Sequence, residues 1–266
     1  MPAGAPPPDR PPLMVQHPVP ASDAVELRWL VPDELPGSAW PRLHALLDPA
    51  EAAQAARFRF DRDRRPYVAA HGLARMMLAR RLGCPAADLR FVVGPHGKPE
   101  LAMAAAAPPL RFSLSHTRGL VAVAVTAVHA VGVDAEAILA DRLAPELASR
   151  IFAPAELAQM RQLAPAAATE AAFAFWTLKE AYTKALGLGL LHPPDAVAFS
   201  LDPLAVLPSP GSGRDGTAWL LRRWRPTPGH ALALALRHPH PAAVRVDAAA
   251  AHPDAFDPAD DPRGLE

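Results

Sequence analysis

This chain has a single cysteine and no formal net charge at pH 7. Its only cysteine is Cys84, which excludes an internal disulfide framework and a cysteine-rich zinc site and is typical of a reducing compartment. Lysine plus arginine equals aspartate plus glutamate at 27 each, so no global basic field indicates a nucleic-acid partner. Basic groups therefore matter only where they cluster locally.

Long apolar runs are missing as well. The N-terminus has no basic segment followed by an apolar one, and no stretch approaches about 18 uninterrupted apolar residues. We therefore expect a soluble, cytoplasmic protein that acts without a membrane and without nucleic acid.

Proline is abundant, with 33 residues, and its distribution predicts the boundaries of the fold. Prolines crowd the first 20 positions, where they prevent regular hydrogen bonding, so we expect a disordered tail over 1–22. Residues 247–266, rich in Ala, Asp and Pro, predict a second disordered tail. Between the tails we expect an N-terminal lobe over 23–129 and a C-terminal lobe over 130–246.

Hydrophobic periodicity predicts an α+β fold of two similar lobes, each with antiparallel strands packed against helices. Strands 120–126 and 131–136 are expected to pair as a hairpin, with a polar loop over 115–119 and another over 203–216. Helices are predicted over 40–47, 51–60, 67–82, 143–151, 154–163 and 173–186, and further strands over 25–31, 89–93, 111–114, 197–201, 219–225 and 230–237.

One predicted helix carries charged residues in a regular stripe. Trp176, Glu180 and Lys184 recur every four residues, which places them on one side of a helix that ends at Gly187. The other side is apolar and suited to a core. Taken alone, a glutamate four residues before a lysine is also the commonest surface decoration of a helix.

Two carboxylates alternate along the strand predicted over 131–136. Asp134 and Glu136 are two residues apart, so they share one face of that strand. Together with Glu180 they offer the hard oxygen ligands that suit Mg²⁺. The competing interpretation is a solvated strand edge.

Three further sets are candidates for binding phosphate. Ser115 and His116 are adjacent, so they point in opposite directions and are poorly placed to act as nucleophile and base, but a hydroxyl and an imidazole suit phosphate. Arg62 and Arg65 belong to a basic run that suits phosphate or an acidic partner. Lys98 follows Gly97 on a turn. The alternatives are a structural loop for the first set and a solvated helix end for the second.

The joint order of these fragments resembles a known family. GKP at 97–99, FSLSH at 112–116, GVDAE at 132–136 and FWTLKEAYTKALGLGL at 175–190 are similar to the motifs of Sfp-type 4′-phosphopantetheinyl transferases. The resemblance covers roughly residues 25 to 240. It implies a monomeric pseudo-dimer of two lobes, with coenzyme A and Mg²⁺ held between them.

The implied reaction moves 4′-phosphopantetheine from coenzyme A to a serine of an apo acyl or peptidyl carrier protein and releases adenosine 3′,5′-bisphosphate. By motif, the catalytic set is Asp134, Glu156, Glu180 and Lys184, where Glu156 would help to deprotonate the serine. The Mg²⁺ ligands would be Asp134, Glu136 and Glu180. The coenzyme would be bound by Lys98, Pro99, Ser115, His116, Lys184 and either Arg65 or Arg62, because relatives carry an arginine at the position of Pro66.

Two other functions fit part of the pattern. An acidic pair followed by E-x-x-x-K also occurs in metal-dependent nucleases, although the neutral charge balance and the lack of an extended basic face weaken this alternative. A non-catalytic interaction module, whose charged stripe is only a solvated face, is the third hypothesis.

Overall fold

A computed structural model describes residues 23–94, 96–102, 109–139, 145–189, 193–207 and 218–252. The helices are α1 (Ala39–Leu46), α2 (Pro49–Ala56), α3 (Asp61–Leu82), α4 (Pro145–Ile151), α5 (Pro154–Arg161) and α6 (Pro165–Leu186). The strands are β1 (Ala24–Leu30), β2 (Phe91–Val93), β3 (Pro99–Leu101), β4 (Leu110–Thr117), β5 (Leu120–Ala127), β6 (Val131–Ala137), β7 (Ala198–Leu201), β8 (Leu204–Leu207), β9 (Ala218–Trp224), β10 (His230–His238) and β11 (Arg245–Ala250).

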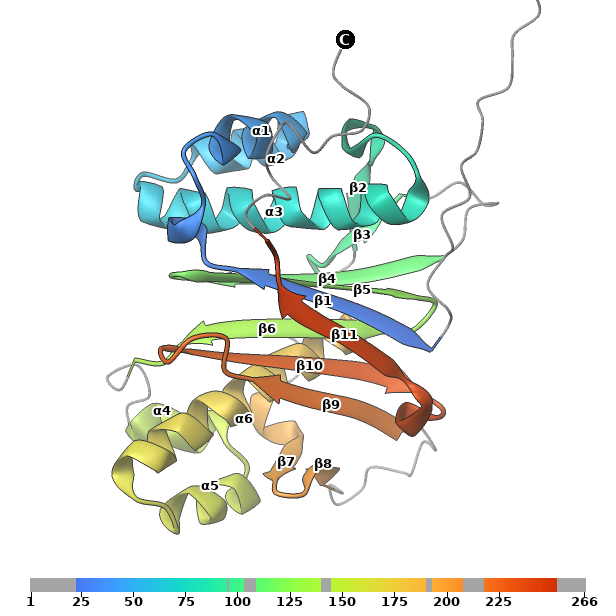
Figure 1. The fold of residues 1–266 in the computed structure, drawn as a ribbon. Coiled ribbons are helices and arrows are strands. Elements are labelled where there is room, and N and C mark those ends of the chain that lie inside the picture. Colours follow the sequence, from blue (N-terminus) through green and yellow to red (C-terminus); the bar gives the residue numbers. More distant parts are fainter. Residues whose placement is uncertain are drawn as a thin grey trace, which may run out of the picture.

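The chain stacks these elements in four layers, helix, sheet, sheet and helix (Figure 1). The upper sheet has the strand order β11-β1-β5-β4 and is covered by α1 to α3. The lower sheet has the order β6-β10-β9 and is covered by α4 to α6. The fold is therefore α+β with two lobes, as expected.

Alternating side chains explain why each sheet can be covered on both faces. In β5, Val121, Val123 and Val125 pack toward α3, whereas Leu120, Ala122 and Ala124 pack toward the second sheet. In β10, Leu232 and Leu234 face the first sheet, whereas the neighbouring alanines lie under α6. A strand that is buried on both faces has a nearly continuous run of apolar residues. The sequences of β5, LVAVAVTA, and β10, HALALALRH, show this pattern.

Local signals fix the helix ends. Asp48 accepts the backbone N–H of Glu51, whose side chain in turn accepts the N–H of Asp48, so a capping box begins α2. Gly83 and Gly187 adopt the left-handed conformation directly after α3 and α6. Both helices therefore end where the sequence predicts.

Four expectations about the fold are corrected. Strand β5 does not pair with β6, because its two edges are already occupied by β1 and β4, and β6 starts the second sheet instead. The predicted loop over 115–119 is mostly strand, since β4 continues to Thr117. The loop predicted over 203–216 contains strand β8. The helix predicted over 51–60 ends earlier, at Ala56, and Arg62 and Arg65 of the basic run lie in the first turns of α3, which begins at Asp61.

The C-terminal segment also departs from the prediction. Residues 245–250 form β11, which pairs in parallel with β1, so the part of the predicted tail over 247–250 belongs to the first sheet. Residues 1–22 and 253–266, the rest of the two predicted tails, lie outside the described residues.

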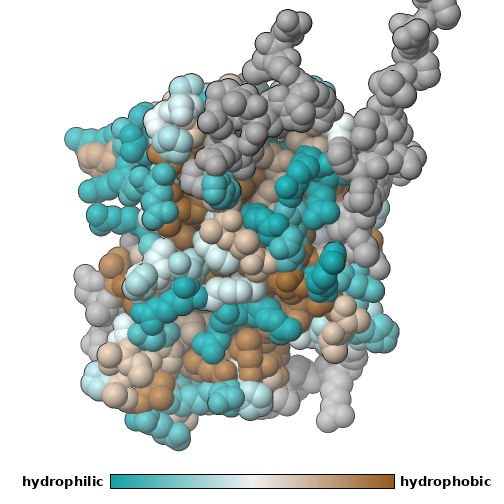
Figure 2. Space-filling view, in the orientation of Figure 1, coloured by the Kyte–Doolittle hydropathy of each residue, from teal (hydrophilic) through white to brown (hydrophobic). Residues whose placement is uncertain are grey.

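On the face shown in Figure 2, hydrophilic side chains gather at the upper left, over α1, α2 and the start of α3. Small apolar areas alternate with polar ones over the sheet layers. None of the described helices is both long and apolar enough to cross a membrane.

Candidate active site

The two sheets meet at a row of hydroxyl groups. Ser113, Ser115 and Thr117 alternate along β4 and point away from α3, toward the edge of β6. Their oxygens accept the backbone N–H groups of Val133, Ala135 and Ala137 at 3.1, 3.2 and 3.4 Å. Side chains thus satisfy the exposed donors of one sheet edge, which would otherwise lack partners.

Helix α6 approaches β6 closely because residue 132 has no side chain. A Cβ atom at Gly132 would lie 1.8 Å from the carbonyl oxygen of Ala181. Only glycine allows this contact, and the contact brings the charged stripe of α6 over the carboxylates of β6.

Asp134 lies at the centre of the resulting cluster. Its Oδ1 accepts the ammonium of Lys184 at 2.7 Å and the hydroxyl of Ser115 at 2.9 Å. Lys184 also donates to Ser115 Oγ at 3.0 Å. Glu136, the next carboxylate on the same face, accepts the indole N–H of Trp176 at 3.2 Å and the hydroxyl of Thr117 at 3.3 Å.

The third predicted carboxylate, Glu180, joins this group. Burial raises the pKa of Glu180, and the charges of Asp134 and Glu136 raise it further, while Lys184 lowers it. A cation bound beside Glu180 would relieve the repulsion from Asp134 and Glu136 that raises the pKa of Glu180. The charges of Asp134 and Glu136 thus act on Glu180, and the role of the three carboxylates as a common set of metal ligands stays a prediction.

One atom of the cluster shows that the residues fit a divalent cation. Asp134 Oδ2 is buried and, among the described residues, has no hydrogen-bond partner. A buried carboxylate oxygen without a partner costs free energy unless a ligand binds it. Oxygen donors of this kind are what Mg²⁺ prefers.

A cavity of about 260 Å³ borders this cluster. Its wall includes Lys98, Pro99, Glu180 and Lys184, together with the glycines that follow α6. Lys98 does not point freely into it, because its ammonium donates to the carbonyls of Val131 at 2.9 Å and Lys184 at 2.8 Å. Burial lowers the pKa of Lys98 to about 8.

Ser115 and His116 diverge as the sequence predicts. Ser115 faces the carboxylates, whereas the ring of His116 lies on the α3 side, edge-on to Tyr67 at 6.0 Å between centroids. Desolvation lowers the pKa of His116 to about 4, helped by His71 and Lys184. A neutral His116 acts as a hydrogen-bond partner rather than as a charge.

The two candidate arginines lie in the first turns of α3. Arg65 stacks over the ring of Trp40 at 5.1 Å and Arg62 over that of Phe60 at 4.8 Å. Neither is joined to the carboxylate cluster by a contact among the described residues. Their roles as phosphate ligands stay predictions.

Glu156 does not belong with the other predicted catalytic residues. Its side chain is fully buried, and its Oε2 lies 2.7 Å from the ammonium of Lys179, which is also buried. The same carboxylate accepts the N–H groups of Ala153 at 2.8 Å and Phe199 at 2.9 Å. These contacts connect α5 to α6 and β7, so Glu156 and Lys179 form a structural ion pair. A general base must lie within hydrogen-bond reach of its substrate, which a fully buried carboxylate does not.

A second group of metal-ligand residue types lies at the start of β1. Asp23, His129 and His238 bring one ligand atom each within 4.8 Å of one another. However, His238 Nδ1 accepts the backbone N–H of His240 at 3.0 Å, so the ring proton sits on Nε2, which faces Asp23 at 3.1 Å. That nitrogen has no free lone pair, and hydrogen bonding explains the group without a metal ion.

Sequence reasoning missed Ser113 and Thr117, which hold the edge of β6 in place. The signal was present, because hydroxyl residues recur at 113, 115 and 117 with the period of a strand. The interpretation of 115–119 as a loop hides this period.

Comparison with known proteins identifies the family of this chain. The model of the 4′-phosphopantetheinyl transferase superfamily matches residues 130–235, and that of the N-terminal part of 4′-phosphopantetheinyl transferase matches residues 36–128. The 4′-phosphopantetheinyl transferase HetI of Nostoc sp. is 36% identical over 169 residues, which cover 64% of this chain and 71% of HetI. A putative 4′-phosphopantetheinyl transferase of Synechocystis sp. is 33% identical over 162 residues, which cover 61% of this chain and 65% of the relative.

The chain belongs to the 4′-phosphopantetheinyl transferase superfamily. Its enzymatic class is accordingly 4′-phosphopantetheinyl transferase, as the motifs predict, and the nuclease alternative finds no support in these matches. Among solved structures, a holo-(acyl-carrier-protein) synthase of Bacillus anthracis in complex with CoA (3′,5′-ADP) is 18% identical, with a TM-score of 0.36 over 41% of this chain and 94% of that chain.

Proposed function

We propose that this enzyme transfers 4′-phosphopantetheine from coenzyme A to a serine of an apo acyl or peptidyl carrier protein, that it requires Mg²⁺, and that it releases adenosine 3′,5′-bisphosphate. The observation that carries the Mg²⁺ requirement is the buried, partnerless Asp134 Oδ2 beside Glu180 and Glu136. The relatives named above support the class of reaction.

The chain's own residues suit this reaction. Asp134, Glu136 and Glu180 would hold Mg²⁺, which when bound neutralises charge on the pyrophosphate of the coenzyme. Lys184, at the edge of the 260 Å³ cavity, supplies a positive charge one helical turn from Glu180. Displacement at phosphorus depends on charge neutralisation and alignment more than on covalent catalysis, so the chain needs no nucleophile of its own.

Ser115 has a positioning role in this proposal. It donates to Asp134 and accepts from Lys184, so it holds the carboxylate and the ammonium in one orientation. Because His116 points to the other face of β4, it would contact a different part of the coenzyme.

The test is a transfer assay with the full chain. Purified protein, coenzyme A, Mg²⁺ and apo carrier proteins of the acyl and peptidyl types are incubated, and carrier mass is measured. We expect the mass of phosphopantetheine to be added, and chelation of Mg²⁺ by EDTA to stop the addition. No mass gain on any carrier contradicts the proposal, and transfer that persists in EDTA contradicts the Mg²⁺ requirement.

A further inference from the structure

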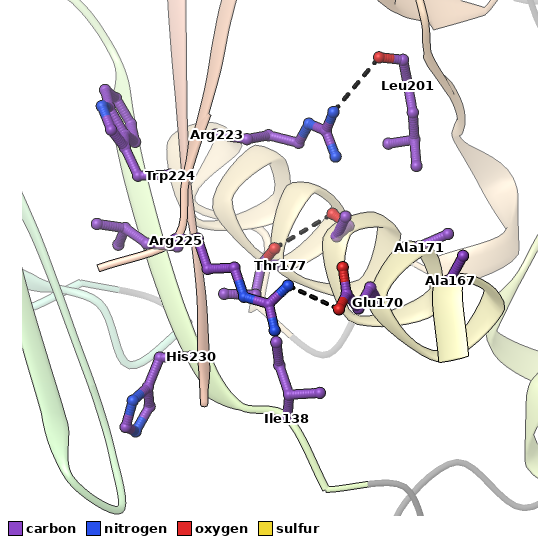
Figure 3. A pocket seen from close by; sticks show the side chains of 13 residues that line it. Ile138, Ala167, Glu170, Ala171, Thr177, Leu201, Arg223, Trp224, Arg225 and His230 are labelled. Carbon is purple, nitrogen blue, oxygen red and sulfur yellow. Dashed lines mark hydrogen bonds and ion pairs between the residues drawn. The ribbon is translucent and has the colours of Figure 1, made fainter. Parts of the chain in front are cut away.

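A second and larger cavity, of about 420 Å³, lies under the first half of α6. Its floor is built from small apolar residues, among them Ala171, Ala174 and Ala231. Arg223 belongs to β9, and Arg225 is the first residue after that strand. Figure 3 shows both side chains extending toward the side of α6, whereas Trp224 points in the opposite direction. The cavity thus combines an apolar floor with a cationic rim.

The two arginines differ in how many of their N–H groups have partners among the described residues. Arg225 forms an ion pair with Glu170 at 2.7 Å and donates to the carbonyl of Pro228 at 2.6 Å. Arg223 is exposed and, among the described residues, has one long hydrogen bond, 3.4 Å to the carbonyl of Leu201. The carboxylate of Asp202 also acts on this guanidinium electrostatically. A guanidinium carries five N–H donors, so Arg223 retains donors for an external carboxylate as well.

The position of the cavity relates it to the carboxylate cluster. Glu136 is opposite Ala231 in the β6–β10 register, and directly opposed residues share a face of the sheet. Ala231 and Ile138, two residues beyond Glu136, line the cavity. Its inner end therefore lies next to Glu136.

The two cavities lie along different halves of α6. Residues 180, 183 and 184 of α6 line the smaller cavity together with Lys98, whereas residues 167, 170, 171, 174 and 177 line the larger one. Of the α6 residues that line the smaller cavity, Glu180 lies nearest in the helix to those that line the larger one. In phosphoryl-type transfer the attacking and leaving oxygens approach in line from opposite sides, so a donor in one cavity leaves the other for the acceptor.

We propose that the 420 Å³ cavity is the docking site of the acceptor protein, which places an apolar side chain on the alanine floor and pairs a neighbouring carboxylate with Arg223. This inference rests on the proposed function, since it assumes that the acceptor is a protein. The positive rim selects an acidic surface, and the size of the cavity fits one large side chain and its surroundings.

The test compares two charge reversals on one strand. Arg223→Glu removes the proposed contact, whereas Arg222→Glu changes the same charge on the opposite face of β9, where residue 222 opposes Leu234. We expect Arg223→Glu to raise the KM for an apo acyl carrier protein roughly tenfold, with kcat and the KM for coenzyme A unchanged, because loss of an interfacial charge pair weakens docking only. Arg222→Glu is expected to match the wild type.

A second variant probes the floor independently of charge. Ala174→Leu fills the cavity and is expected to raise the KM for the carrier in the same way. A carrier variant in which the contacting carboxylate is replaced by lysine is expected to regain affinity for Arg223→Glu.

The outcomes separate this inference from the proposed function. If Arg223→Glu and Arg222→Glu have the same KM for the carrier, or if only the KM for coenzyme A rises, the docking site is overturned while the transfer activity stands. If the wild-type protein modifies no carrier, the proposed function fails and the docking site fails with it.

Discussion

The ammonium of Lys98 donates to the main-chain carbonyl of Lys184 at 2.8 Å. Lys98 comes from the turn before β3, in the first half of the chain, and Lys184 lies in the last turn of α6. A positive charge near the C-terminal end of a helix interacts favourably with its dipole. One side chain thus joins the two lobes at the position where α6 presents its phosphate-binding candidate.

This contact predicts a pH-dependent contribution to stability. Burial lowers the pKa of Lys98 to about 8, below its ordinary value of 10.5, so between these values the unfolded chain binds the proton more tightly than the folded one. The stability of the wild type relative to Lys98→Met is therefore expected to rise with pH from about 8 to 10.5. Urea denaturation of both proteins at several pH values measures it. A difference that stays constant across this range contradicts the prediction.

Removal of Glu180 should abolish cation binding without loss of the fold. We expect Mg²⁺ to raise the melting temperature of the wild type and to leave that of Glu180→Gln nearly unchanged, because one of three carboxylates is lost. Glu170→Gln is the matched control, since Glu170 lies on the same helix but pairs with Arg225. Differential scanning fluorimetry with and without Mg²⁺ gives the result, and an equal response of Glu180→Gln and the wild type removes Glu180 from the metal site.

Substitution of Gly132 should be poorly tolerated. A methyl group there collides with the backbone of α6, so Gly132→Ala is expected to lower the free energy of unfolding by more than about 2 kcal/mol. Gly37→Ala, at a position with no atom within 4 Å of the added carbon, is expected to be close to neutral. Chemical denaturation measures the free energy of unfolding of both variants. Equal values for Gly132→Ala and Gly37→Ala would show that α6 can move away from β6 at little cost in free energy.

The buried pair of Glu156 and Lys179 should matter for stability and not for the chemical step. Removal of one partner leaves an uncompensated buried charge, so Glu156→Gln is expected to cost about 3–5 kcal/mol, whereas Glu156→Gln with Lys179→Met costs less than the sum of the singles. At a temperature where Glu156→Gln is folded, its kcat is expected to equal that of the wild type. A large fall in kcat in the folded variant would restore Glu156 as a catalytic residue.

The hydroxyl row between the sheets can be tested amide by amide. Ser115→Ala leaves the N–H of Ala135 without its acceptor, so hydrogen exchange at Ala135 is expected to accelerate while that at Val133, which donates to Ser113, is unchanged. Nuclear magnetic resonance measures both amides in one sample. Equal protection of Ala135 in the variant and the wild type would show that another group satisfies it.

Local patterns in the sequence predict most of the individual elements. The alternation of β5 and β10, the capping box of α2 and the glycines after α3 and α6 each act within a few residues, so their signals are complete in the sequence. The carboxylates of β6 and the stripe of α6 are likewise visible, because both depend on fixed periods.

Pairing between distant segments is what the sequence does not show. The assignment of β5 and β6 to one hairpin fails because strand pairing depends on which edges other strands already occupy, and β1 and β4 come from elsewhere in the chain. The motif alone places Glu156 in the active site, whereas its contacts with Lys179 and Phe199 indicate a structural role.

Strand β11 has a consequence for how the molecule is made. The sheet of the first lobe has β11 at its edge, hydrogen-bonded to β1, although more than 200 residues separate the two strands. During synthesis β11 leaves the ribosome after every other described strand, so the first lobe cannot complete its sheet until β11 has been made. The lobe that is synthesised first is thus one of the last parts to close.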